Sequence, residues 1–168
     1  MQFGPVERLT KTHQLDRFQC GEPVLDEWLT KHALAAHKDG SASVRVVTEK
    51  DSDRVVGYYA LTMASVALAD TPRRAGQGMP DPVPAILLAR FATDSSVQGT
   101  GLGSALMKDI FLRSLVVADE IGSRALLVHA KNSAARSWYE RWDFEVSPTD
   151  DLHLWMLIKD IRRVAATD

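Results

Sequence analysis

The sequence predicts a single domain over residues 1–168, of the α+β or mixed α/β class, with helices packed against one sheet. Two observations set this class. The 168 residues, 45% hydrophobic and 25% charged, suit one globular core and show no repeat, low-complexity tract or linker. The predicted elements run helix, three strands, glycine-rich turn, helix, strand, helix, two strands, an order typical of helices covering one sheet.

The first predicted helix begins at Glu22-Pro23, since proline is tolerated in a first helical turn, and ends at Asp39-Gly40. Its apolar side recurs at helical spacing in Leu25, Trp28, Leu29, His32 and Ala36. The β-branched residues 44–47 predict a strand, and residues 55–66 predict a longer one. The turn residues 51–53 join these two strands into a hairpin.

The second half begins with a loop, residues 70–84, which holds four prolines and two glycines. Residues 85–93 are apolar on both faces, which predicts a central strand. After the glycine turn at 98–103 comes a helix that ends near Gly122, with a buried stripe of Leu102, Ala105, Leu106 and Ile110.

The remaining segments are shorter. Residues 125–130 predict a strand, and Asn132 can cap a helix that runs through Trp142. Residues 144–146 and 152–158 close the chain as strands.

The turn Gln98-Gly99-Thr100-Gly101-Leu102-Gly103 follows a strand and opens a helix. Its glycines permit positive φ, and the free N–H groups and dipole of a helix start favour an anion such as a pyrophosphate. The turn lacks the Gly-Lys-Ser/Thr ending of a P-loop, and its glycine spacing is not that of a Rossmann turn. The alternative is a glycine-rich connection that binds nothing.

The segment Gln98-x-x-Gly101-x-Gly103 resembles the (Gln/Arg)-x-x-Gly-x-(Gly/Ala) signature of GNAT acetyltransferases, and its context from Leu87 to Leu157 is similar to theirs. The resemblance implies the GNAT fold, a central, mostly antiparallel mixed sheet flanked by helices. It also implies an N-acetyltransferase that uses acetyl-CoA and no metal. Tyr139 corresponds to the residue that protonates the departing CoA thiolate in many members.

The resemblance further implies which residues bind acetyl-CoA. The turn would hold the pyrophosphate, and backbone N–H groups near the end of the central strand would hold the thioester oxygen and pantetheine arm. The full expected set is Phe91, Ala92, Thr93, Gln98, Gly99, Thr100, Gly101, Leu102, Gly103, Ser104 and Asn132.

The first half narrows the resemblance. The segment Phe18–Leu29 is similar to the F-x-C-x-x-x-x-L-D-x-F-L segment of GNAT toxins from type II toxin–antitoxin pairs, and residues 57–61, 84–92 and 127–130 are also similar to that group. The resemblance implies acetylation of the α-amine of aminoacyl-tRNA, inhibition of translation, a homodimer, and a ribbon-helix-helix antitoxin.

Two positions depart from the family pattern. Asp143 stands where the family has glycine, but aspartate tolerates left-handed backbone better than most residues, so we expect the turn to survive. Thr93 stands where an aliphatic residue is common, which matters little if backbone groups meet the cosubstrate.

The formal net charge of −2 provides no general attraction for nucleic acid, so tRNA would have to meet a local basic face. By resemblance, the residues expected to contact tRNA phosphates are Lys31, Lys38, Arg73, Arg74 and Arg90. Solvated surface charge is the alternative for each of them.

Other side chains have simpler interpretations. We expect His32 and His37 on a helix surface or a dimer interface, and His129 as a hydrogen-bonded core histidine. His32 and His37 lack partners at metal-ligand spacing, so no metal site is expected there. Packing roles are expected for Cys20, Trp28 and Trp142.

The N-terminus lacks the basic and apolar segments of a secretory signal, and the longest apolar runs are far shorter than the roughly 20 residues of a membrane helix. The lone cysteine fits a reducing compartment, so a cytoplasmic protein without membrane association is predicted. Two functional alternatives stay open: a GNAT enzyme that acetylates a small amine or a protein N-terminus, and a non-catalytic acyl-CoA-binding regulatory module.

Overall fold

The structure, a computed structural model, describes residues 2–166, which group into two compact units. The first comprises the chain up to Thr62 together with Ala89–Ile110, and the second comprises Met63–Leu88 and the chain from Phe111. Three elements contribute residues to both units: strand β3 (Val55–Val66), strand β4 (Val83–Thr93) and helix α4 (Leu102–Ile121). That residues 1–168 form a single domain stays a prediction.

The first unit has strands in the order β1-β2-β3-β4. Its other elements are β1 (Glu7–Arg8), helix α1 (Pro23–Lys31), helix α2 (Ala33–Asp39), β2 (Ser43–Thr48) and a short 3-10 turn (Ser95–Val97). The predicted hairpin is confirmed, because β2 and β3 pair antiparallel around the turn at Asp51. The predicted bounds of β3 are those observed.

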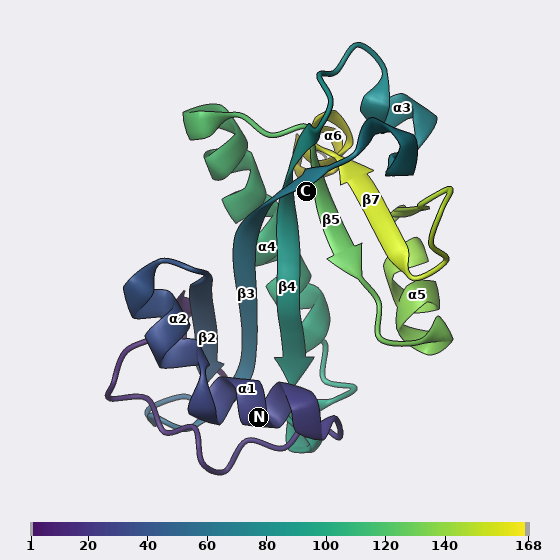
Figure 1. The fold of residues 1–168 in the computed structure, drawn as a ribbon. Coiled ribbons are helices and arrows are strands. Elements are labelled where there is room, and N and C mark those ends of the chain that lie inside the picture. Colours follow the sequence, from purple (N-terminus) through teal and green to yellow (C-terminus); the bar gives the residue numbers. More distant parts are fainter. Residues whose placement is uncertain (1, 167–168) are drawn as a thin grey trace. The chain divides into compact units, whose positions relative to one another are not determined.

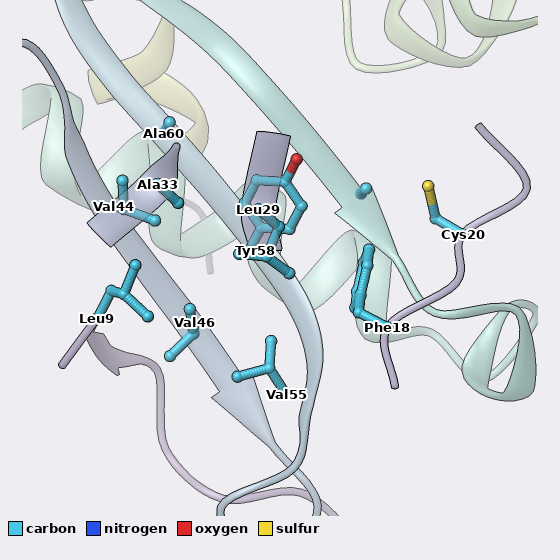
Figure 2. Packing of buried hydrophobic residues seen from close by; sticks show 11 residues of the cluster. Leu9, Phe18, Cys20, Leu29, Ala33, Val44, Val46, Val55, Tyr58 and Ala60 are labelled. Carbon is cyan, nitrogen blue, oxygen red and sulfur yellow. The ribbon is translucent and has the colours of Figure 1, made fainter. Parts of the chain in front are cut away.

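Alternation along β3 places the helices of this unit on opposite faces of the sheet. Tyr58 lies on the face covered by α1. On this face, Leu29 of α1 and Ala33 of α2 form a core with Val44 and Val46 of β2 (Figure 2). Its neighbour Gly57 faces α4, because a Cβ at this position would lie 3.0 Å from the Leu106 side chain and 3.3 Å from the Leu102 side chain.

The second unit has strands in the order β3-β4-β5-β7-β6. Here β4 and β5 are parallel, whereas β7 pairs antiparallel with β5 and with β6, which confirms a mixed sheet. Its other elements are a short 3-10 turn (Leu68–Asp70), α3 (Arg73–Gly76), β5 (Ala125–His129), α5 (Ser133–Glu140), β6 (Glu145–Val146), β7 (His153–Leu157) and α6 (Ile158–Ala166).

One sheet face of this unit packs Leu127 and Trp155 against Ala75 of α3. A separate aromatic cluster joins α4, α5 and the turn after α5. In it the ring of Phe111 lies 5.7 Å from that of Trp142 and 6.2 Å from that of Phe144.

The predicted single helix over residues 23–39 is wrong. The chain breaks at His32, which has φ −124°, and α1 and α2 run in different directions (Figure 1). The apolar spacing gives no sign of this break, because buried Leu29 and Ala33 keep an i, i+4 spacing across it. After the break, α2 lies along β2, and His37 Nδ1 accepts a hydrogen bond from the Val44 backbone N–H at 2.9 Å.

The structure also corrects several helix and strand ends that the sequence predicts. The chain does not close on strands, since Ile158 begins helix α6. Ala105 is exposed, and Met107 is buried in the α4 stripe instead. The predicted loop over residues 70–84 contains the one-turn helix α3, and β4 already begins at Val83. Helix α5 ends at Glu140 rather than Trp142.

The stability of the fold should depend on pH through His37. Burial lowers the pKa of His37 below its ordinary 6.5, and the nearby Arg8 and Arg45 lower it further. The unfolded chain therefore binds a proton below pH 6.5 that the folded chain does not, so stability falls as pH drops from 6.5 toward the folded pKa.

We expect the loss of unfolding free energy between about pH 7.5 and about pH 5.5 to be larger for the wild type than for His37→Gln. The glutamine amide oxygen can accept the same hydrogen bond but does not titrate. Urea unfolding at both pH values measures the difference, and the other histidines cancel because both proteins carry them. Equal losses would show that His37 does not contribute.

Candidate active site

The turn before α4 has backbone dihedrals that require glycine at two positions. Gly99 has φ +81° and Gly101 has φ +91°, and a Cβ at either would meet no atom within 4 Å. Glycine is therefore needed here for the left-handed backbone and not for lack of space. Helix α4 begins at the next residue, Leu102.

This turn presents backbone donors that the protein itself does not use. The Thr100 N–H donates to the Val97 carbonyl, and the first helical bond of α4 runs from the Ala105 N–H to the Gly101 carbonyl. Among residues 2–166, no acceptor is found for the N–H groups of Gly99, Gly101, Leu102, Gly103 and Ser104. With the positive end of the helix dipole beside them, these groups fit an anion such as a pyrophosphate.

The side chain of Gln98 braces the turn. Its Nε2 donates to the backbone carbonyls of Cys20 and Thr93, each at 3.0 Å. One amide therefore ties the turn both to the N-terminal segment and to the end of β4. Cys20 is buried, as its predicted packing role implies, and its Sγ lies 3.6 Å from the Glu22 carbonyl oxygen.

A buried carboxylate, Asp94, fixes the chain between β4 and the turn. It accepts hydrogen bonds from the backbone N–H of Gln19 at 2.8 Å and of Ser96 at 3.0 Å, and it pairs with Arg54 at 3.4 Å. Burial raises the pKa of Asp94, but the hydrogen bonds from Ser96 and Gln19 and the Arg54 charge together lower it more, so the net pKa is lowered. The sequence contained one signal for this role that the prediction did not use, because an aspartate directly before a short turn is typical of a capping residue.

The end of β4 extends past its pairing with β5. The parallel register joins Ala85–Leu88 to Ala125–Val128, and β4 continues to Thr93. The expected thioester-binding residues Phe91, Ala92 and Thr93 all lie in this extension, directly before Asp94.

Tyr139 lies on α5 in the second unit, 8% exposed, with ring contacts to Trp138 at 5.3 Å and Phe144 at 5.6 Å. Burial raises the pKa of Tyr139, so its hydroxyl stays protonated at neutral pH. No hydrogen-bond partner for this hydroxyl is found within the described part of the chain. Tyr139 therefore offers a neutral O–H donor to a ligand.

Two residues shape the helix that carries Tyr139. Asn132 caps α5, and its side chain accepts from the Ala135 N–H at 2.9 Å, as the sequence predicts. Asp143 adopts the left-handed backbone at φ 72°, which confirms that the turn survives without glycine.

The expected tRNA contacts fall in both units. In the first unit, the Arg90 guanidinium lies over the Trp28 ring, 5.1 Å from its centroid, and Lys31 pairs with Glu27 at 3.3 Å. Lys38 is exposed on α2. In the second unit, α3 carries exposed Arg73 and Arg74. Half-buried Trp28 also stacks on Tyr58, so Arg90 has an ordered aromatic support.

His129 is not the core histidine that its apolar strand predicts. It is exposed at the end of β5, where its ring stacks on that of His153 at 3.8 Å. Although the residue is exposed, its stacked ring is partly desolvated, which lowers the pKa of His129, and the neighbouring His153 lowers it further. Between residues 2 and 166, no three or more His, Cys, Asp and Glu residues gather in a way that could hold a metal ion.

These features agree with what comparison with known proteins finds. Residues 41–146 match the Acetyltransferase (GNAT) domain. The chain belongs to the GNAT acetyltransferase family. The predicted family, its fold and its acetyl-CoA-dependent acetyltransferase class are thereby confirmed.

Individual GNAT proteins are similar along almost the whole chain. A tRNA-acetylating toxin of Mycobacterium tuberculosis (strain ATCC 25618 / H37Rv) is 51% identical over 160 residues, which cover 95% of each chain. The structure of AtaT complexed with acetyl-methionyl-tRNAfMet has a TM-score of 0.89 at 25% identity, over 97% of this chain and 99% of that one. A mutant AtaT toxin bound to the C-terminus of the antitoxin AtaR and acetyl-CoA has a TM-score of 0.82 at 25% identity, over 99% of both chains.

Proposed function

We propose that this GNAT enzyme transfers the acetyl group of acetyl-CoA to the α-amine of an aminoacyl-tRNA and thereby blocks translation as the toxin of a toxin–antitoxin pair. The observation that carries this proposal is the 51% identity, over 95% of the chain, to a tRNA-acetylating toxin. Because the match covers 95% of the chain, it spans both most of the segment before β2 and the glycine turn.

The free donors of the turn support its role as the pyrophosphate site. In this role the N–H groups of Gly99 and of the four residues 101–104 bind phosphate oxygens, while Gln98 holds the turn in place through its two carbonyl contacts. The backbone of Phe91–Thr93 then lines up the pantetheine arm and the thioester oxygen. Asn132 contributes by capping the helix that carries Tyr139.

The acceptor chemistry needs little help from a base. A free α-amine has a pKa near 8, so a substantial fraction is neutral at working pH, whereas a lysine side chain near 10.4 is not. The amine attacks the thioester carbon, the C–S bond breaks, and the sulfur takes a proton. Tyr139 supplies that proton as the general acid. The attacking nitrogen releases one proton to water, and Tyr139 regains a proton from water, so that the net reaction moves one proton from nitrogen to sulfur.

We extend the proposal to the protein's partners. The similarity to AtaT bound to the antitoxin AtaR supports an antitoxin as the partner. The ribbon-helix-helix type of that antitoxin and a homodimeric state are proposed from the sequence resemblance, and a cytoplasmic location is proposed from the lone cysteine. No helix within residues 2–166 is long and apolar enough to cross a membrane.

Expression in bacteria tests the toxin assignment. Induction of the wild-type chain without an antitoxin should arrest growth, and Tyr139→Phe at the same protein level should not. Unchanged growth with abundant soluble wild-type protein would contradict the assignment. The net charge of −2 would then favour the acetylation of a small amine.

A further inference from the structure

Helices α3 and α6 share one carboxylate in the second unit. Asp160 on α6 pairs with Arg74 of α3 at 3.1 Å and with Arg163, one turn along α6, at 3.4 Å. The two helices lie beside each other in Figure 1, although 86 residues separate Arg74 from Asp160 in the sequence. A single aspartate thus holds two guanidinium groups together.

Hydrogen bonds from distant residues hold the backbone of α3 and of the turn before it. Arg124 donates from Nε to the Ala75 carbonyl at 2.9 Å and from Nη2 to the Arg74 carbonyl at 2.8 Å. At the other end of the loop, Ser147 Oγ donates to the Asp70 carbonyl at 3.1 Å. These hydrogen bonds fix the backbone that carries Arg73 and Arg74.

Helices α3 and α6 carry four exposed cations that we call the α3–α6 basic surface: Arg73, Arg74, Lys159 and Arg163. Arg74 and Arg163 pair with Asp160, and Arg73 and Lys159 are the residues directly before Arg74 and Asp160 on the same two helices. Lys159 and Arg163 are neighbours on α6 at i, i+4 spacing. The pairs that involve these four residues within the described chain include only one carboxylate, Asp160, so most of their positive charge is uncompensated. Arg163 and Arg74 have side chains 74% and 53% exposed, which leaves guanidinium donors open to solvent.

Phosphate groups are suitable ligands for such a surface. Guanidinium groups bind phosphate oxygens in a bidentate manner, and closely spaced cations match the regular charge spacing of a nucleic-acid backbone. We propose that the α3–α6 basic surface binds backbone phosphates of tRNA, so that the C-terminal helix contributes to substrate binding. This inference rests on the proposed function, because tRNA is the substrate named there.

The test is equilibrium binding of uncharged tRNA, followed by fluorescence anisotropy at several salt concentrations. Arg163→Gln should weaken binding roughly five- to tenfold and lower the slope of log affinity against log salt by about one. Arg163→Lys should recover most of the affinity, because it keeps the charge. Arg162→Gln is the matched control: Arg162 is the next residue on the same helix but pairs at 2.9 Å with Asp119 of α4. We expect it to change affinity less than twofold.

Unchanged affinity for Arg163→Gln, or an equal loss for Arg162→Gln, would overturn the inference. A variant that keeps tRNA affinity but releases the antitoxin would also overturn it and assign the surface to protein binding. The readout does not depend on catalysis. A wild-type enzyme that binds tRNA here but never acetylates charged tRNA would refute the proposed function and leave this surface in place.

Discussion

Replacement of Tyr139 by phenylalanine should lower kcat for acetyl transfer by roughly 100-fold or more, because general acid catalysis typically contributes 10²- to 10⁴-fold. The hydroxyl has no partner within the described chain, so its removal leaves no buried group unsatisfied. The KM for acetyl-CoA and the thermal midpoint should therefore stay close to wild type. Steady-state kinetics with both substrates varied, together with a thermal unfolding scan, measures all three quantities.

A second buried tyrosine provides the matched control. Tyr59, 1% exposed on β3, donates its hydroxyl hydrogen bond to Asp109 of α4. Tyr59→Phe removes that donor and should cost about 1–3 kcal/mol of stability. Its kcat per folded molecule should be unchanged. If Tyr59→Phe loses as much turnover as Tyr139→Phe, the loss is a general effect of removing a buried hydroxyl and Tyr139 is not the acid.

Substitution of Gly101 by alanine should raise the KM for acetyl-CoA about tenfold or more. Alanine at φ +91° is strained by about 1–2 kcal/mol, and relief of that strain moves the turn and its N–H groups away from the phosphate position. A loss of about 1.4 kcal/mol corresponds to a factor of ten in affinity. Isothermal titration with acetyl-CoA measures the change in binding directly.

The control for this substitution lies at the other end of the same helix. Gly122 follows α4 with φ +84°, and a Cβ there would also meet no atom within 4 Å. Gly122→Ala therefore carries a similar backbone strain without touching the turn. It should lower stability as Gly101→Ala does and leave acetyl-CoA binding unchanged. Weaker binding in both variants would attribute the effect to destabilised α4 and not to the turn.

Local signals predicted the parts of the site that depend on neighbours in sequence. The glycine pattern at 98–103 identified a left-handed turn and the start of α4, and both are observed. Asn132 as a cap and Asp143 as a left-handed residue follow from side chains acting within a few positions of themselves. These features need no tertiary context, so the sequence alone was sufficient.

The parts that the sequence did not reveal depend on contacts between distant segments. Asp94 fixes this part of the chain because it accepts a hydrogen bond from the Gln19 N–H and pairs with Arg54. Neither contact can be predicted from a local sequence pattern. The break at His32 occurs inside an unbroken apolar spacing. His129 lies in an apolar strand but at its last residue, where the side chain leaves the core. Helix α6 had a detectable i, i+3 pattern at Ile158 and Ile161, which the preceding strand obscured.

The most direct test of the proposed activity is transfer of labelled acetyl from acetyl-CoA to a pool of charged tRNA, with uncharged tRNA as the control. We expect label on charged tRNA only, and we expect hydrolysis of the aminoacyl ester to release it as an N-acetyl amino acid. Label on uncharged tRNA, or no label from an enzyme that still binds acetyl-CoA, would contradict aminoacyl-tRNA as the acceptor.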